Sequence, residues 1–169
     1  MTQLPRRLSG FTLFINGRDK GGLISSIKLP QLSVKSEGYR SGGMDMPVPI
    51  LTGGMDMMEV EITLSEYDPQ VMGNLGNRST PVQMQAKGVA RLNNAYQTLV
   101  IKMSGYITQI PGWDWTAGET NPTMTFTTQL SYYAIDIDGV NVIEIDPVNM
   151  KRVINGQDQL EFIRLFLFA

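Results

Sequence analysis

The chain has 169 residues, of which 16 are acidic and 14 basic, and it contains no cysteine and no histidine. Charges of both signs are interspersed, so the chain lacks the clusters of Lys and Arg that tight nucleic-acid binding requires. Without Cys and His, disulfides, thiol catalysis and the commonest general bases and metal ligands are excluded. We therefore expect a protein that is not an enzyme and uses no cofactor, folded as a single domain over 1–169.

Extended chain is predicted for the first part of the sequence. Residues 11–16 read as a strand, and the glycine-rich segment 17–22 reads as its turn. Spaced apolar residues then predict a second extended stretch over 24–39. The early apolar run is too short for a signal-peptide core or a membrane span, so we expect a soluble protein made where it acts.

An internal echo marks residues 42–57. The sequence Gly-Gly-Met-Asp-Met occurs at 42–46 and again at 53–57, enclosing a proline-rich apolar piece. Glycines free the backbone, prolines remove hydrogen-bond donors, and methionines supply adaptable apolar contact area. We predict a long extended loop that is a poor strand and docks on a neighbouring subunit; the alternative is a floppy hairpin tip. The candidate docking residues are Gly42, Gly43, Met44, Asp45, Met46, Ile50, Leu51 and Met55.

Four later segments alternate apolar and polar residues, as a strand with one buried side does. They lie at 57–64, 82–92, 98–108 and 123–132, and Asn93-Asn94 is the predicted turn between the second and the third. The predicted buried residues include Met58, Val60, Ile62, Met84, Met103, Phe126, Leu130 and Tyr132. The polar faces, to which Ser104 is assigned, mix both signs of charge at Glu59, Glu61, Lys87, Arg91 and Lys102.

Two segments are predicted to be helical. Residues 68–76 begin with Asp68 and Pro69 and end with a glycine, which is typical of a short capped helix. In 158–168 apolar residues recur at helical spacing, while phenylalanines leave the other side apolar too. A helix that is apolar all round is normally covered by other protein.

The densest group of carboxylates consists of Asp136, Asp138, Glu144 and Asp146. Such a group could hold calcium or act as a glycosidase pair. The spacing departs from that of an EF-hand, because Asn141 and Pro147 occupy the positions that require Gly and Glu. Asp138-Gly139 between two apolar runs predicts a tight hairpin, so we favour turn chemistry for these side chains.

Trp113 and Trp115 support an alternative function. Two tryptophans so close in a loop could stack on sugars, and with the carboxylates near Asp138 they would make a monomeric carbohydrate-binding β-sandwich. The competing interpretation is that both rings anchor their loop against the sheet.

Three parts of the chain together resemble one known family. Residues 131–149 and 153–160 resemble the C-terminal region of the major tail tube proteins of contractile-tailed bacteriophages and of R-type pyocins. Residues 29–47, LPQLSVKSEGYRSGGMDMP, look like that family's "LPKL…Y-R-x-G-G-M-D" segment. Residues 114–119, DWTAGE, resemble its "W-K-A-G-E" loop. The resemblance covers the chain nearly end to end.

The resemblance implies a mainly β fold, an antiparallel β-sandwich or barrel-like tube domain with one or two short helices. It implies hexameric rings that stack into a hollow tube, which would also hide the unpaired edges of long antiparallel strands. The loop 42–57 would then join rings, and Glu59, Glu61, Lys87, Arg91 and Lys102 are the candidates for the lumen.

Partners and location follow from the same resemblance. A sheath would surround the tube, baseplate and terminator proteins would close its ends, and DNA would pass through without tight binding. Assembly is expected in the bacterial host cytoplasm, and the product would be either a phage virion tail or a headless tailocin. The monomer is not expected to insert stably into a membrane.

Overall fold

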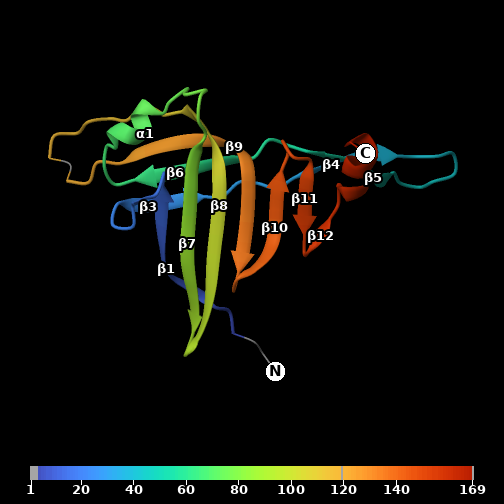
Figure 1. The fold of residues 1–169 in the computed structure, drawn as a ribbon, viewed down its shortest axis with the longest axis horizontal. Helices are drawn as coiled ribbons and strands as arrows, with labels where there is room; N and C mark the ends of the chain where they lie inside the picture. The colour runs from blue at the N-terminus through green and yellow to red at the C-terminus, as the bar shows by residue number, and fades with distance from the viewer. Residues whose placement is uncertain (1–3, 119, 169) are drawn as a thin grey trace.

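The structure, a computed structural model, describes residues 4–118 and 120–168. Within them the chain forms a ten-stranded antiparallel sheet, a separate two-stranded ribbon and two short helices (Figure 1). The mainly β fold predicted from the sequence is confirmed. The strands are β1 (Arg7–Ile15), β2 (Arg18–Asp19), β3 (Ile24–Lys28), β4 (Val34–Tyr39), β5 (Val48–Met55), β6 (Glu59–Leu64), β7 (Val82–Leu92), β8 (Ala95–Gln109), β9 (Met124–Ile137), β10 (Val140–Asp146), β11 (Lys151–Ile154) and β12 (Gln157–Asp158), and the helices are α1 (Pro69–Gly73) and α2 (Glu161–Phe168).

Strand β9 is the centre of the large sheet. The main order of strands is β12-β11-β10-β9-β8-β7-β1-β2, while β6 pairs with the first half of β9 and β3 pairs with β6. Two strands, β6 and β10, thus share one edge of β9, and the sheet bends between them. In Figure 1, β3 and β6 run across the direction of β7 and β8.

One apolar core fills the bend. The alternation predicted from the sequence is confirmed for most strands, because Val60, Ile62 and Leu64 of β6 are fully buried while Glu59 and Glu61 are exposed. The largest fully buried side chains are Tyr133, Phe126, Leu13, Ile62, Leu64, Met103, Ile107, Met124, Val60, Val71 and Thr128. Side chains from both sides of the bend, β6 on one and β1 and β8 on the other, therefore contribute to the core.

Two predicted tight turns are confirmed, and their backbone angles explain their sequences. Asp138 and Gly139 have φ values of 50° and 78°, and they join β9 to β10. Asn93, with φ of 52°, turns β7 into β8. Asp138 and Gly139 both have positive φ, whereas in the β7–β8 turn only the first central residue, Asn93, does. Turns of these kinds match the right-handed twist of the flanking strands, and Asn, Asp and Gly adopt positive φ most readily.

The alternation predicted for β9 is wrong beyond residue 130. The register of β8 and β9 shifts between Ser104 and Gly105, where Ser131 is the extra residue on β9. Tyr133 rather than Tyr132 therefore enters the core, and burial raises the pKa of Tyr133 to about 12. Ser104, predicted on the polar face, is buried at the same bulge.

The segment predicted as an extended loop over 42–57 is largely a β-ribbon. Strand β5 pairs with β4 from Val34 opposite Met55 to Tyr39 opposite Val48, so only 40–47 connect the two strands without ladder pairing. The prolines are tolerated because each strand of a two-stranded ribbon has a free edge.

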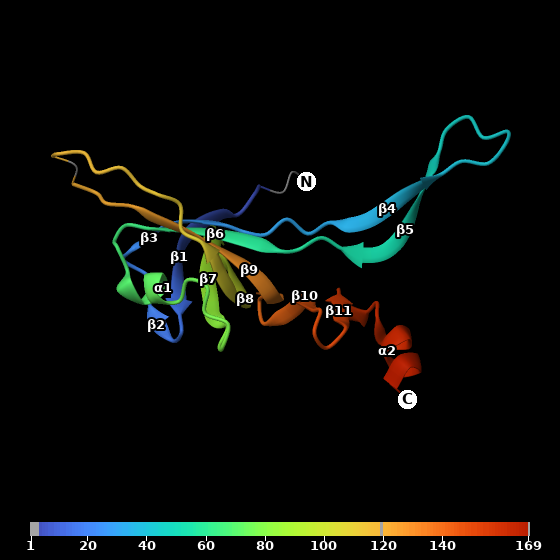
Figure 2. The ribbon, with the colours of Figure 1, turned by 90° about the horizontal axis from the view of Figure 1, so that it is seen from above.

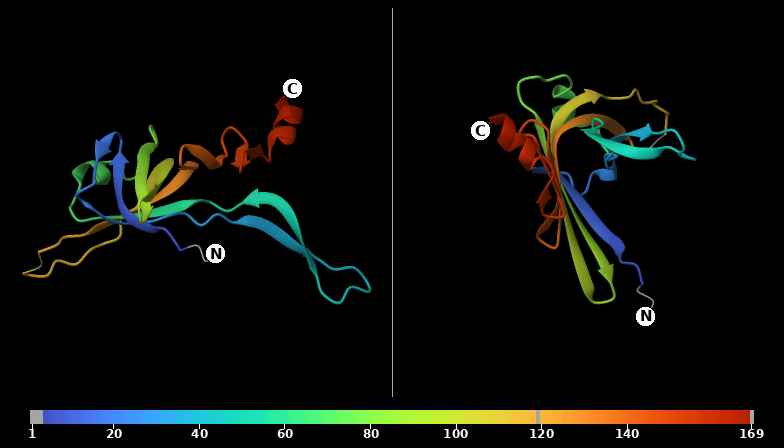
Figure 3. Two further views of the ribbon diagram at one scale, coloured as in Figure 1. Left: turned by 90° about the horizontal axis from the view of Figure 1, so that it is seen from below. Right: turned by 90° about the vertical axis from the view of Figure 1, so that its right-hand side faces the viewer.

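The continuous stretch predicted over 24–39 is interrupted, since 29–33 are irregular between β3 and β4. We call residues 34–55 the arm, which projects away from the large sheet (Figures 2 and 3).

The short helix α1 is capped as its sequence predicts. Asp68 Oδ1 accepts a hydrogen bond of 2.9 Å from the Gln70 amide, and Pro69 is the first helical residue. Asp68 Oδ2 lies 2.7 Å from Lys20 Nζ, and both side chains are largely buried. Burial acts to raise the pKa of Asp68, but the bonds from Lys20 and Gln70 outweigh it and hold that pKa below its usual value. The bond to Asp68 raises the pKa of Lys20 in spite of burial.

Removing the charge of Asp68 is expected to destabilise the fold in a pH-dependent way. Asp68→Asn keeps an oxygen for the cap but leaves Lys20 without its closest anion, and breaking a buried pair costs about 3–5 kcal/mol. The lowered pKa of Asp68 means that its charge stabilises the fold above pH 3.8, and that this contribution is lost as the pH falls further. Urea unfolding of wild type and variant should therefore show a gap that is large at pH 7 and closes below pH 3. An equal gap at both pH values would contradict the pairing.

Candidate interaction surfaces

The five charged residues predicted on the polar strand faces lie on one side of the large sheet. Cross-strand partners point to the same side, as do residues two apart along one strand. Glu59 pairs with Gln129, and Gln129 pairs with Tyr106. Tyr106 stands four residues from Lys102 on β8, so Glu59 and Lys102 share a side. The same reasoning, carried into β7 and along β6, places Glu59, Glu61, Lys87, Arg91 and Lys102 together, opposite the core. We call this side the polar face.

Several cations on the polar face have partners within the chain. Lys102 Nζ lies 3.2 Å from Asp136 Oδ2, and Lys151 Nζ lies 3.1 Å from Glu144 Oε2. Lys87 Nζ stands 5.1 Å from the centre of the Phe14 ring, a cation–π distance. The two ion pairs offset the positive charge of Lys102 and Lys151. Sequence reasoning found Lys87 and Lys102 but not their partners, which stand on other strands.

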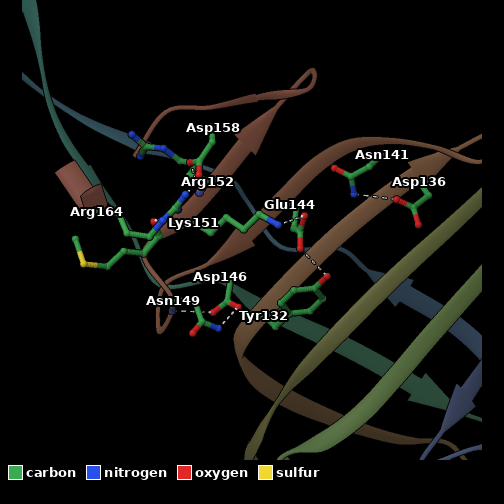
Figure 4. A network of polar contacts seen from close by, with 11 residues as sticks. Tyr132, Asp136, Asn141, Glu144, Asp146, Asn149, Lys151, Arg152, Asp158 and Arg164 are labelled. Atoms are coloured by element: carbon green, nitrogen blue, oxygen red, sulfur yellow. Dashed lines mark hydrogen bonds and ion pairs between the residues drawn. The ribbon is translucent and has the colours of Figure 1, made fainter. Parts of the chain in front are cut away.

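A second layer of hydrogen bonds holds the carboxylates of the polar face. Asn141 donates to Asp136 at 2.9 Å, and the Tyr132 hydroxyl donates to Glu144 at 3.2 Å (Figure 4). The bond from Asn141, and then Lys102, lower the pKa of Asp136 against the opposing effect of burial. Burial, reinforced by the charge of Glu144, raises the pKa of Tyr132.

Turn chemistry accounts for the remaining carboxylates of the predicted group. Asp138 Oδ1 accepts a hydrogen bond of 2.9 Å from the Thr98 amide, and Asp146 accepts one of 3.2 Å from the Asn149 amide. Figure 4 shows Asp146 and Asn149 facing each other across their turn. In residues 4–118 and 120–168 no three His, Cys, Asp or Glu side chains are placed to hold a metal ion.

The two tryptophans contact Tyr67 rather than the carboxylates. The rings of Trp113 and Tyr67 stack with centres 5.0 Å apart, and Trp115 Nε1 donates to the Tyr67 hydroxyl at 3.1 Å. The loop is thus tied to Tyr67, in the segment between β6 and α1, rather than to the sheet as predicted, and Trp115 remains 82% exposed. The tryptophan loop lies before β9, and Asp138 comes directly after its last residue, Ile137. Figure 1 shows the loop at one end of β9 and the turn into β10 at the other. A strand of 14 residues spans roughly 45 Å at ~3.3 Å per residue. The combined carbohydrate site predicted from Trp113, Trp115 and Asp138 is therefore wrong.

The arm exposes most of the predicted docking residues. The side chains of Met46 and Leu51 are 68% and 70% exposed, and Ile50 is exposed as well. Met55 differs, because it is partly buried against the core at the base of the arm. At the tip, the Arg40 Nε and the Ser41 amide donate to the carbonyl oxygen and the sulfur of Met44, at 3.1 and 3.2 Å. The tip is therefore ordered by its own contacts.

A pocket of about 450 Å³ lies where the arm meets the C-terminal strands. Met55, Met57, Met58, Ile145 and Met150 supply apolar walls. Arg152 also lines it; this side chain is only 8% exposed, and one terminal nitrogen donates 3.0 Å to the Gly53 carbonyl of the arm. We call this the base pocket. Sequence reasoning missed it, because an arginine on the core side of a short strand gives no periodic signal.

Helix α2 carries an exposed apolar surface. Asp158 accepts from the Leu160 amide at 3.0 Å and from Arg164 at 2.7 Å, which fixes the start of the helix. Burial acts to raise the pKa of Asp158, but these bonds hold it below its usual value. The exposed apolar side chains are Phe162, Ile163, Leu165, Phe166, Leu167 and Phe168. Helix 158–168 is thus confirmed with a later start, and in the part of the chain that the structure describes no helix is long and apolar enough to cross a membrane.

Comparison with known sequences gives matches along almost the whole chain. The family model described as phage tail tube protein FII matches residues 5–167. The tail tube protein of Escherichia phage P2 is 28% identical over 165 residues, which cover 94% of each chain. The major tail tube protein of Serratia phage KSP20 is 27% identical over 150 residues, covering 86% of this chain and 85% of the relative.

Solved structures of contractile injection systems share the fold. A chain of the anti-feeding prophage tube-terminating cap has a TM-score of 0.57 at 12% identity, covering 80% of this chain and 93% of that one. A chain of the PVC sheath–tube complex in its extended state has a TM-score of 0.55 at 10% identity, covering 78% and 91%. At such identities the likeness concerns the fold alone.

Proposed function

The chain belongs to the phage tail tube protein FII family, and we propose that it assembles into hexameric rings that stack as the hollow inner tube of a contractile tail. The fold and the two phage relatives support a structural subunit of the tail tube. The proposal covers a tube in a phage virion tail and a tube in a headless tailocin. We assign the chain no bond chemistry; its proposed role is to form a rigid conduit that penetrates a bacterial envelope.

The free ends of the large sheet are the observation that best supports a ring. At one end β2 pairs only with Phe14 and Ile15 of β1, and at the other end the last strand is the two-residue β12. Along the described chain, then, most of β1 offers an unpaired edge. Free edges at opposite ends suit a head-to-tail contact between copies, and such contacts close into rings when the rotation allows.

The polar face is the proposed wall of the lumen. Its lysines at positions 102 and 151 are paired with Asp136 and Glu144, so they offer less free positive charge to phosphate. Because DNA affinity comes largely from Lys and Arg neutralising phosphates, this arrangement would let DNA slide. A sheath would lie outside the tube, with baseplate and terminator proteins at its ends.

Reversing the charge of two residues on this face is expected to make the tube retain DNA. Glu59→Lys combined with Glu61→Lys changes two exposed side chains, and exposed charges contribute about 0–1 kcal/mol, so the melting temperature should barely change. Tubes of this variant should retain labelled DNA at low salt, whereas wild-type tubes should not. The matched control, Asp114→Lys with Glu161→Lys, changes the net charge equally at exposed positions away from the face. Equal DNA retention by both variants would argue against a lumenal polar face.

Sedimentation velocity tests the assembly itself. Purified protein at micromolar concentration should contain a species of six times the 18.8 kDa chain mass, or longer tubes. A chain that remains monomeric at all concentrations, with and without crowding agents, would contradict ring formation.

A further inference from the structure

The base pocket holds a cation without an anionic partner. Two of the charged residues that line it form ion pairs: Asp56 Oδ1 lies 3.7 Å from Lys35 Nζ, and Lys151 Nζ lies 3.1 Å from Glu144 Oε2. The backbone amide of Arg152 donates to Asp158, but within the described chain its guanidinium donates only to the neutral Gly53 carbonyl, and the buried Nε has no hydrogen-bond partner. A buried charge without a counter-charge is costly, so the pocket is suited to an added carboxylate.

The walls of the pocket define what should accompany that carboxylate. Four methionines line it, Met55, Met57, Met58 and Met150, and thioether side chains adapt to apolar partners of irregular shape. The matching ligand is a short segment with one acidic residue flanked by flexible apolar ones.

The arm tip has this chemistry. Asp45 stands between Met44 and Met46, it is exposed, and it forms no ion pair within residues 4–118 and 120–168. Met46 is 68% exposed. The tip sequence Gly-Gly-Met-Asp-Met recurs at 53–57, and four of the five residues of that second occurrence, Gly53, Met55, Asp56 and Met57, line the pocket.

The tip cannot reach the pocket of its own chain. Strand β5 runs from Val48 near the tip to Met55 at the pocket, and eight extended residues span roughly 25 Å at ~3.3 Å per residue. Figures 2 and 3 show the loop of the arm at the far end from the C-terminal strands. An occupant with this sequence must therefore come from a second copy.

We propose that Met44-Asp45-Met46 of one copy docks into the base pocket of a second copy, with the Asp45 carboxylate facing Arg152. The proposal rests on tube assembly and names the contact that the arm makes within it. It also gives Arg152 two roles, since the same guanidinium fixes the base of one arm and receives the tip of another.

Disulfide trapping tests the contact directly, because the chain has no native cysteine. Met46→Cys protein and Met57→Cys protein are mixed, assembled and oxidised; Met57 is 68% exposed at the pocket. A disulfide needs Cα atoms about 4.4–6.8 Å apart, so a cross-linked dimer would place the tip at the pocket. Each variant alone, and Met46→Cys mixed with Tyr96→Cys, should give no dimer. Tubes that form without the cross-link would overturn the docking while leaving the tube function intact.

Two substitutions of Asp45 test the charge. Asp45→Glu keeps the carboxylate and should assemble like wild type, while Asp45→Asn should raise the critical concentration for assembly roughly tenfold or more. Equal assembly of the two variants would overturn the pairing with Arg152. A cross-link between Phe166→Cys and Met57→Cys proteins instead would show that α2 of a second copy fills the pocket. Failure of wild type to assemble under any condition would remove both the tube function and the docking.

Discussion

Alanine in place of Gly105 is expected to destabilise the chain by at least about 3 kcal/mol, the upper end of the usual cost of overpacking. A Cβ at this position would lie 2.9 Å from Leu130 Cα and closer still to the Gln129 carbonyl oxygen. These are backbone atoms at the β8–β9 bulge, so neither can rotate away. For a domain of this size the melting temperature should fall by roughly 10 °C.

The matched control is Gly10→Ala. Gly10 also lies in a strand beside a register shift, but a Cβ there would meet no atom within 4 Å. Thermal unfolding followed by circular dichroism should therefore separate the two variants clearly. Equal melting temperatures for Gly105→Ala and Gly10→Ala would contradict the close approach of β8 and β9 at the bulge.

Shortening the arm is expected to abolish tubes while leaving the monomer folded. Replacing 37–50 by Asn-Gly would connect Ser36 directly to its partner Leu51 through a tight hairpin turn. The removed residues are almost all exposed, so the melting temperature should change by only a few degrees. Assembly should fail, because each Å² of apolar arm surface buried between copies contributes about 25 cal/mol, less the cost of ordering the tip.

Two variants with a full-length arm serve as controls. Met46→Leu and Leu51→Met conserve apolar volume, so both should still assemble. Negative-stain images and a thermal melt of all three variants give the answer. Normal tubes from the shortened chain would refute the docking role, and loss of the folded monomer would show that the arm belongs to the core.

Most of the strands, turns and helix ends can be predicted from hydrophobic periodicity and turn chemistry. The buried face of β6, the Asp138-Gly139 hairpin and the Asp68 cap each depend on neighbours a few residues away, so the sequence predicts them. The phase change at Ser131 depends on how β8 meets β9, and no local pattern marks an extra residue in an otherwise regular strand. The pairing of β4 with β5 was hidden by prolines and glycines that a free-edged ribbon tolerates.

The surfaces were predicted less completely than the fold. Alternation put Glu59 and Lys102 on polar faces, but only the register across three strands shows that they share one side. The partner of Lys102 and the burial of Arg152 come from contacts between strands that lie far apart in sequence. Such contacts leave no short-range signal.

Electron microscopy of the purified protein tests the proposed function most directly. We expect rings with sixfold symmetry, or tubes built from them, and a map in which β6, β7 and β8 turn Glu59, Lys87 and Lys102 toward the bore. Monomers that never yield rings or tubes, or a tube that carries these side chains on its outer wall, would contradict it.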